Sequence, residues 1–335
     1  METNEETNYI LETPFLNCMD HEIIDLAELG LGTVRGLVEW SGFTIIYNLE
    51  GLIVRSGSIN GNTVIQKDIH VRNILITDEY VYLTSFDGLF SVDKEGEFTQ
   101  HLNEICEDIV LTSGGDVVLT VVADFMANRI MKLENDFSLT PYSDNHQAES
   151  KCVPLQEIEF IGDKDIFATT CDGYVVHFEN REFKAAFGMK EMNLPGVPAS
   201  KEFFLASHED DLIVVAKKSS TFYSILKYKA EGEWIDLKTF ERGTQNSQKD
   251  VDMRLPNISD IMVYEDKLYV ATTNASCWGI HEFDLSKNES LTENDYHIIQ
   301  DPNFPSQCLR RFWMNESGNI SVVTNDSKLV KMKCR

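Results

Sequence analysis

The sequence predicts an all-β chain of repeated four-stranded sheets, and three observations support this. The stretch 158–178, IEFIGDKDIFATTCDGYVVHF, alternates apolar and polar residues with a period of two. Similar strand–turn–strand stretches recur at 74–92 and 261–283. Their strands are separated by short polar turns of the hairpin kind, such as Asp172-Gly173. Because one such unit cannot bury its apolar face alone, the repetition implies that the sheets stack on one another.

The spacing of the units predicts that there are seven. Blades of a β-propeller, each a four-stranded sheet, repeat at roughly 40–50 residues, and the units of this chain follow that period loosely. We align the units on the residue that begins each second strand, namely Gly42, Tyr80, Asp116, Asp165, Asp211, Lys267 and Asn319. We therefore expect a seven-bladed β-propeller that takes residues 1–335 as one domain. Its blades should start near residues 36, 71, 107, 155, 202, 258 and 308.

The two ends of the chain are expected to close the ring. The last unit has no fourth strand of its own, and the strand-like segment 9–16, within an N-terminal stretch of residues 1–18, can supply it. Closure would protect two sheet edges that otherwise promote aggregation. Residues 20–29 should follow as a short helix or an irregular lead-in. Opposite charges would then face each other across the strand pair, with Glu2, Glu5, Glu6 and Glu12 opposite Lys328, Lys331, Lys333 and Arg335.

The charge balance restricts the class of partner. The chain has 29 Lys and Arg against 55 Asp and Glu, a net charge of −26. Such a charge repels nucleic-acid backbones and anionic membranes and favours basic protein partners, although it also serves solubility. The acidic N-terminus lacks an apolar run, and the seven cysteines contain no CxxC pair. We therefore expect an intracellular protein, cytoplasmic or nuclear, in a reducing compartment.

Motifs that carry catalytic chemistry are missing from the sequence. There is no GxSxG elbow, no flanked catalytic cysteine and no HxxxH pair, so we expect no catalytic residue, metal ion or cofactor. The glycines of GLGTVRG at 30–36 do not have the spacing of a dinucleotide loop. The acidic turn 208–211, HEDD, is predicted to be solvated, because calcium loops need several oxygens at fixed spacing. A convergent triad stays open, since triads are recognised by geometry.

The turns between second and third strands carry the candidate binding residues. These turns place carboxylates at equivalent positions, where they would ring one face of the propeller around its central channel. A ring of this kind attracts a basic segment, while Asp before Gly is also ordinary turn chemistry. Two tryptophans are candidate interface anchors or core residues. The candidate partner-binding residues are Glu50, Asp87, Asp124, Asp172, Asp326, Trp278 and Trp313.

Three segments resemble the second-to-third-strand part of WD40-like repeats. They are TSFDGLF at 84–90, TTCDGYVVHF at 169–178 and VTNDSKLVKM at 323–332. The chain lacks the Gly-His and Trp-Asp dipeptides of that family; Phe178-Glu179 and Phe283-Asp284 are the nearest equivalents. The resemblance covers residues 36–335 and identifies no subfamily.

The resemblance implies a docking platform in a larger assembly. Together with the charge, this predicts a non-catalytic scaffold whose acidic face docks a basic protein segment within a larger complex. Two alternatives stay open. One is a propeller hydrolase with its site at the channel mouth. The other is a substrate adaptor of a ubiquitin ligase, because FENR at 178–181 is similar to a degenerate Trp-Asp-x-Arg box.

Overall fold

A computed structural model gives the arrangement of the strands. It describes residues 15–16, 19–48, 50–124, 127–143, 155–162, 164–170, 173–188, 191–192, 202–219, 222–229, 232–241, 258–274, 277–286, 291, 296–299, 309–314, 319–324 and 327–333. These residues form strands and turns, with no helix among them.

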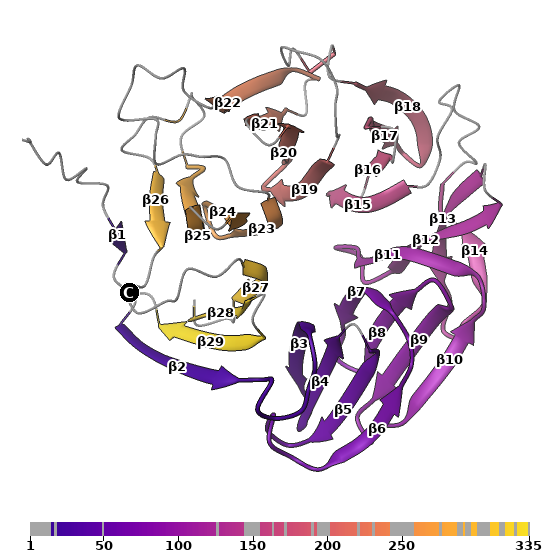
Figure 1. The fold of residues 1–335 in the computed structure, drawn as a ribbon. Coiled ribbons are helices and arrows are strands. Elements are labelled where there is room, and N and C mark those ends of the chain that lie inside the picture. The colour runs from indigo at the N-terminus through magenta and orange to yellow at the C-terminus, as the bar shows by residue number, and fades with distance from the viewer. Residues whose placement is uncertain are drawn as a thin grey trace, which may run out of the picture.

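The described strands form seven sheets around a central axis, which confirms the predicted seven-bladed β-propeller (Figure 1). Within each of blades 1–6, four consecutive strands pair in antiparallel order from the axis outward. Blade 1 contains β3 (Val34–Trp40), β4 (Phe43–Asn48), β5 (Leu52–Ser56) and β6 (Thr63–Lys67). Blade 2 contains β7 (Val71–Ile76), β8 (Tyr80–Ser85), β9 (Gly88–Asp93) and β10 (Phe98–Leu102). Blade 3 contains β11 (Ile105–Leu111), β12 (Val117–Asp124), β13 (Ala127–Leu133) and β14 (Leu139–Pro141).

The remaining blades continue around the ring to the chain ends. Blade 4 contains β15 (Leu155–Ile161), β16 (Asp165–Thr170), β17 (Val175–Glu179) and β18 (Glu182–Phe187). Blade 5 contains β19 (Glu202–His208), β20 (Asp211–Ser219), β21 (Phe222–Tyr228) and β22 (Trp234–Glu241). Blade 6 contains β23 (Ile258–Tyr264), β24 (Lys267–Asn274), β25 (Cys277–Asp284) and β26 (Tyr296–Ile299). Blade 7 contains β27 (Leu309–Met314), β28 (Asn319–Thr324), β29 (Lys328–Lys333) and, from the N-terminus, β2 (Met19–Asp25).

The innermost strands begin close to the expected blade starts. The expectation was 36, 71, 107, 155, 202, 258 and 308. The first strands begin at Val34, Val71, Ile105, Leu155, Glu202, Ile258 and Leu309.

An N-terminal strand closes blade 7, but it is not the segment that the sequence suggested. Strand β2 pairs antiparallel with β29 and places Glu22 opposite Lys331 and Asp25 opposite Lys328. This register places residues of opposite charge across the closing pair, while Lys331 Nζ makes its ion pair with Glu39 of blade 1, at 2.9 Å. The prediction that residues 9–16 form this strand is wrong in position. Residues 9–14, and the acidic residues Glu2, Glu5, Glu6 and Glu12, lie outside the described residues.

The segment just before the closing strand joins a different blade. Strand β1 (Phe15–Leu16) pairs in parallel with β26, with Phe15 opposite Ile298, and becomes the fifth strand of blade 6. The N-terminal part of the chain therefore passes from blade 6 to blade 7 before it enters blade 1 (Figure 1).

The short helix considered for residues 20–29 does not form. Residues 19–25 are extended and residues 26–30 turn toward blade 1. The free edge of β29 supplies backbone partners for a strand at this place, and such tertiary pairing overrides a ten-residue helical pattern. Ile23 lies on this outermost strand and is 43% exposed. Because apolar side chains of the strand are not confined to a buried face, its sequence shows little alternation of apolar and polar residues.

The second strands are buried on both faces. Residues 212–216 of β20 are completely buried, although they are consecutive. A blade packs against a neighbour on each side, so its middle strands lose the alternation of a half-exposed sheet. This explains the continuous apolar runs, such as LIVVA, in the centres of the repeats.

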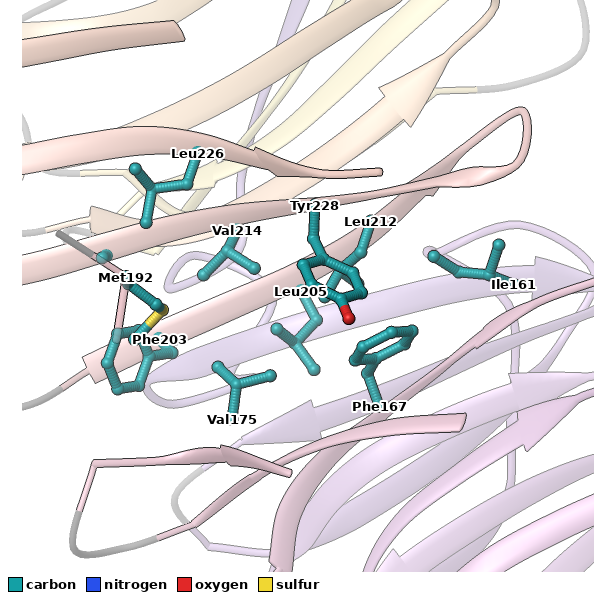
Figure 2. Close-up of a cluster of buried hydrophobic side chains, with 11 residues drawn as sticks. Ile161, Phe167, Val175, Met192, Phe203, Leu205, Leu212, Val214, Leu226 and Tyr228 are labelled. Atoms are coloured by element: carbon teal, nitrogen blue, oxygen red, sulfur yellow. The ribbon is translucent and has the colours of Figure 1, made fainter. Parts of the chain in front are cut away.

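The hydrophobic core lies between the blades. Figure 2 shows one such layer, where Phe167 and Val175 of blade 4 face Leu205, Val214 and Tyr228 of blade 5. Seven clusters of this kind occur in the described residues, one at each junction of neighbouring blades. The cluster between blades 7 and 1 contains Leu26, just past the closing strand, so ring closure rests on packing as well as on strand pairing.

Candidate partner-binding face

All blades present the same kind of turn on the same face of the ring. Leu205 N donates to Glu157 Oε2 at 3.2 Å, and Ser207 N donates to Glu159 Oε1 at 3.1 Å, so β15 and β19 run parallel. Because each blade has the same antiparallel strand order, first strands that run in one direction place all turns between second and third strands on one face of the ring. We call this the front face. The back face carries the turns between first and second strands and those between third and fourth strands, such as the turn that contains Glu95.

β-Bulges near the starts of the first strands aim pairs of polar residues at neighbouring blades. The register of β7 shifts between Val71 and Ile74, and that of β11 shifts between Cys106 and Ile109. A bulge inserts a residue and re-aims side chains, often beside functional sites. Two consecutive side chains of each strand thereby contact the neighbouring blade. They are Arg72 and Asn73 in blade 2, and Glu107 and Asp108 in blade 3.

Asp108 holds three blades together beside the axis. Its carboxylate accepts a hydrogen bond from Asn73 Nδ2 of blade 2. Its other oxygen accepts a hydrogen bond from Ile158 N of blade 4, at 2.7 Å. Thr120 Oγ1 accepts from Asp108 N at 2.9 Å, which fixes the buried aspartate in place. Buried polar groups that are satisfied in this way rigidify their surroundings, so the front face of blades 2–4 rests on a fixed base.

An aromatic ring stands exposed on this base. Phe86, in the turn between β8 and β9, is 51% exposed. The guanidinium of Arg72 lies over its ring, 4.5 Å from the ring centroid. Arg72 Nη2 lies 2.5 Å from Glu107 Oε2 of the next blade, so the cation under the ring is neutralised. Burial raises the pKa of the Glu107 carboxyl, and Arg72 opposes that rise. Phe86, Arg72 and Glu107 form a stack across the junction of blades 2 and 3.

Asp87 follows the exposed ring and presents its carboxylate to solvent. Ser85 Oγ accepts a hydrogen bond from Asp87 N, and Gln100 Nε2 donates to Asp87 O, so the backbone is held at both ends. The next residue, Gly88, has φ +133°, and a Cβ there would meet Leu102 O at 1.8 Å. Only glycine fits this turn. Among the described residues the Asp87 carboxylate has no hydrogen bond or ion pair.

Glu50 occupies the equivalent turn of blade 1. Gly51 repeats the geometry of Gly88, with φ +133° and the backbone of Lys67 close to where a Cβ would lie. Glu50 is exposed and reaches over Gly32, whose missing side chain leaves room for the carboxylate. The front face of blades 1 and 2 also exposes Asp68 and Glu104, together with the cations Arg35 and Lys67.

The other five predicted residues are less informative. Asp124 and Trp278 lie at strand ends next to their turns, with side chains outside the described part. Asp172 and Asp326 lie outside the described residues altogether. Trp313 is half-buried and packs against the cluster between blades 7 and 1, as a core residue does. The structure therefore describes exposed side chains only for Glu50 and Asp87, in neighbouring blades.

The back face is acidic as well. Its turns expose six carboxylates in three blades: Asp78, Glu79, Glu209, Asp210, Glu265 and Asp266. In the HEDD turn, the predicted solvated loop, residues 209 and 210 are exposed while His208 is buried, its Nε2 3.3 Å from Asp266 Oδ1. Exposed carboxylates occur on both faces, so charge does not distinguish the front face from the back face. The exposed Phe86 and its supporting stack do.

Four consecutive blades share a diagonal polar side-chain pair that the sequence did not predict. In each pair, one side chain comes from residue i at the start of the second strand. The other comes from the third-strand residue that lies opposite residue i+2, and the two side chains are 2.7 Å apart in all four pairs. Diagonal neighbours across an antiparallel strand pair are close enough for long side chains to meet, so an alignment of the second and third strands would have predicted these pairs. The pairs are Asp116–Lys132, Asp165–His177, Asp211–Lys227 and, with the signs reversed, Lys267–Glu282.

A serine and a histidine do approach each other in blade 2, away from the axis. Ser91 Oγ lies 2.7 Å from His101 Nε2, between the third and fourth strands. Ser91 is only 2% exposed, and the His101 ring stacks on Phe137 of blade 3 at 3.7 Å. Burial lowers the pKa of His101. Because the serine is buried and an aromatic ring stacks on the histidine, we assign the pair to packing.

The Cys106 thiol is buried as well. Burial raises the pKa of the Cys106 thiol to about 12, which keeps it protonated and unreactive. No group of three or more His, Cys, Asp or Glu side chains suited to a metal ion occurs among the described residues. In the same residues there is also no helix of the length and apolarity that crossing a bilayer requires.

Comparisons with solved structures support the fold. A streptogramin B lyase is 13% identical, with a TM-score of 0.62, and the match covers 95% of this chain and 99% of that one. The WD40 domain of Pan2 from Neurospora crassa is 11% identical, with a TM-score of 0.63, over 95% and 97% of the two chains. A YCF48 structure bound to a D1 peptide is 9% identical, with a TM-score of 0.64, over 96% and 100%. No family model and no curated protein matches the sequence.

The WD40-like resemblance is therefore confirmed as a resemblance of fold. The same fold serves a lyase and a peptide-bound protein among these structures, so the fold does not select the activity.

Proposed function

We propose that this protein is a non-catalytic interaction scaffold that docks a basic protein segment on the front face of blades 1–3. The observation that carries the proposal is the exposed ring of Phe86, held by Arg72 and Glu107 and followed by the free carboxylate of Asp87. A rigid, half-exposed aromatic side chain beside a charged group is a typical anchor of protein interfaces.

Charge complementarity supports a basic partner. The chain has a net charge of −26, and four exposed carboxylates lie in the front-face turns and loops of blades 1–3, namely Glu50, Asp68, Asp87 and Glu104. Arg35 and Lys67 reduce the local excess without cancelling it. Such a surface raises the association rate of a cationic segment, and the effect weakens as salt screens the charges.

An enzymatic function finds less support in the described residues. Two histidine pairs found there, Ser91 with His101 and Asp165 with His177, are part-buried and each joins neighbouring strands of one blade. The ubiquitin-ligase adaptor remains a special case of the scaffold. Its motif at 178–181 begins with Phe178, a completely buried residue, and Arg181 lies over the Tyr142 ring of blade 3. Those two contacts favour a structural role for the segment.

The proposal is tested with a fluorescein-labelled 12-residue peptide of repeated Lys-Gly-Lys-Ser, titrated at 50–300 mM NaCl. We expect binding that weakens steadily with salt. Neutralising the front face with Glu50→Gln, Asp68→Asn and Asp87→Asn should weaken binding about tenfold, from roughly 0.5 kcal/mol per charge. The matched control neutralises three exposed back-face carboxylates, Asp78→Asn, Glu95→Gln and Glu209→Gln. Equal losses in both triple variants would contradict a specific front face.

A further inference from the structure

We infer that Phe86 and Asp87 together form a site for an arginine side chain of the partner, so that the scaffold distinguishes arginine-rich from lysine-rich segments. This inference rests on the proposed function and names the chemistry that the same face recognises. It starts from the two surfaces that Phe86 presents. One face of its ring is covered by Arg72, and the exposed half of the side chain is left for a partner.

The free face of the ring suits a planar cation. A guanidinium stacks on an aromatic face through cation–π attraction and flat contact, and arginine does this better than lysine. Arg72 already makes this contact from below, which shows that a guanidinium fits the ring. Its charge would repel a second cation if it were unpaired. Glu107, 2.5 Å away, neutralises it.

The neighbouring carboxylate completes the site. Asp87 adjoins Phe86 in the chain and is exposed. Among the described residues its carboxylate accepts no hydrogen bond and forms no ion pair. A guanidinium on the ring has donors in a fixed fork that match the two oxygens of a carboxylate. A lysine ammonium can pair with Asp87 but gains little from the ring face. The site therefore adds a preference for arginine to a general attraction for positive charge.

The turn is rigid enough to hold this geometry before a partner arrives. Ser85 and Gln100 fix the backbone of Asp87, and Gly88 fixes the turn against Leu102. Arg72 is held by Glu107 from the next blade. A preorganised site loses less conformational entropy on binding than a mobile one.

The test compares two fluorescein-labelled 12-residue peptides at 150 mM NaCl, one with six arginines and one with six lysines, each alternating with Gly and Ser. We expect the arginine peptide to bind at least about threefold more tightly, the range of an exposed cation–π contact. Phe86→Ala should remove this preference while the lysine peptide binds nearly as before. Phe86→Leu keeps an apolar side chain and should remove the preference as well, because the π face is lost. Asp87→Asn should weaken both peptides.

The matched control is Phe183→Ala, which removes another half-exposed phenylalanine, 43% exposed on β18 of blade 4. It should leave both affinities and their ratio unchanged. Equal affinities for the two peptides in the unmodified protein would overturn the arginine site, as would a preference that survives in both Phe86 variants. If both peptides bind, and only the front-face triple variant weakens them, the scaffold stands and the arginine site is wrong. If neither peptide binds, both ideas fall.

Discussion

At the scale of single residues, the ion pairs between neighbouring strands of a blade differ in burial, and this decides how much each contributes to stability. Lys227 is 2% exposed, and its Nζ lies 2.7 Å from Asp211 Oδ2. Lys184 and Glu179 form a pair at 2.6 Å on the surface, where screening leaves it worth little. The nitrogen–oxygen distances of the two pairs are similar, but the buried pair contributes more to the free energy of unfolding than the exposed one.

Removing the carboxylate of the buried pair should be costly. Asp211→Ala leaves the Lys227 ammonium inside the protein without that partner, and we expect a loss of about 2–4 kcal/mol in unfolding free energy. Asp210→Ala, one residue away and exposed, should change stability by less than about 0.5 kcal/mol. Thermal unfolding of the two variants measures the difference. Similar melting temperatures for both would show that the pair is not a stabilising contact.

Glu159 should make stability depend on pH. Burial, together with the charge of Asp108, raises its pKa from 4.5 to about 7, against the opposing hydrogen bond with Ser207. The folded state then binds a proton between pH 4.5 and 7 that the unfolded state has lost. Stability must fall as pH rises through this window, and the penalty is complete above about pH 7. Glu159→Gln should remove this pH dependence of the unfolding free energy, because glutamine does not titrate. Melting temperatures of the two proteins from pH 4.5 to 7.5 would contradict the assignment if the curves ran parallel.

The sequence predicted the positions of some site residues and missed their neighbours for a physical reason. Asp87 was found because Asp-Gly marks a hairpin turn, and turn chemistry is local. Phe86 was not found, because a phenylalanine in a β-rich segment is ordinarily core. Only the assembled blade shows that its ring lies over Arg72 and outside the core. The Arg72–Glu107 pair joins two blades, which no local pattern reveals.

At the scale of elements, the outer strands carry the weakest sequence signal and hold the ring closed. Second strands such as β20 are buried on both faces, and their sequences are continuous apolar runs. The closing strand β2 has one edge paired and an exposed isoleucine, Ile23, so its sequence resembles a loop or a short helix. The period of the repeat predicted seven blades, while the identity of the closing strand depended on pairing between the two chain ends.

Two N-terminal truncations separate the roles of β1 and β2. Deleting residues 1–18 removes the short parallel pairing with β26 and should lower the melting temperature only slightly. Deleting residues 1–25 also removes β2, exposes the edge of β29, and should open the ring with a large loss of stability and aggregation. Circular dichroism melts and light scattering measure both. A protein lacking residues 1–25 that melts like the full chain would disprove closure by β2.

At the scale of the whole molecule, net charge and architecture together define what the ring can bind. Carboxylates lie on both faces, so an acidic surface is general and the exposed aromatic stack is local. We expect no binding of DNA or RNA at physiological salt, because like charges repel the phosphate backbone. A gel-shift experiment with a mixed-sequence duplex measures this. A shifted band at 150 mM NaCl would contradict the charge argument.

The most direct test of the scaffold is capture from native lysate with three baits, followed by quantitative mass spectrometry. The baits are the unmodified protein, the front-face variant with Glu50→Gln, Asp68→Asn and Asp87→Asn, and the back-face variant with Asp78→Asn, Glu95→Gln and Glu209→Gln. A front-face scaffold predicts a small set of partners with basic segments that the back-face variant retains and the front-face variant loses. Partners that are retained equally by all three baits, or lost only from the back-face variant, would contradict it.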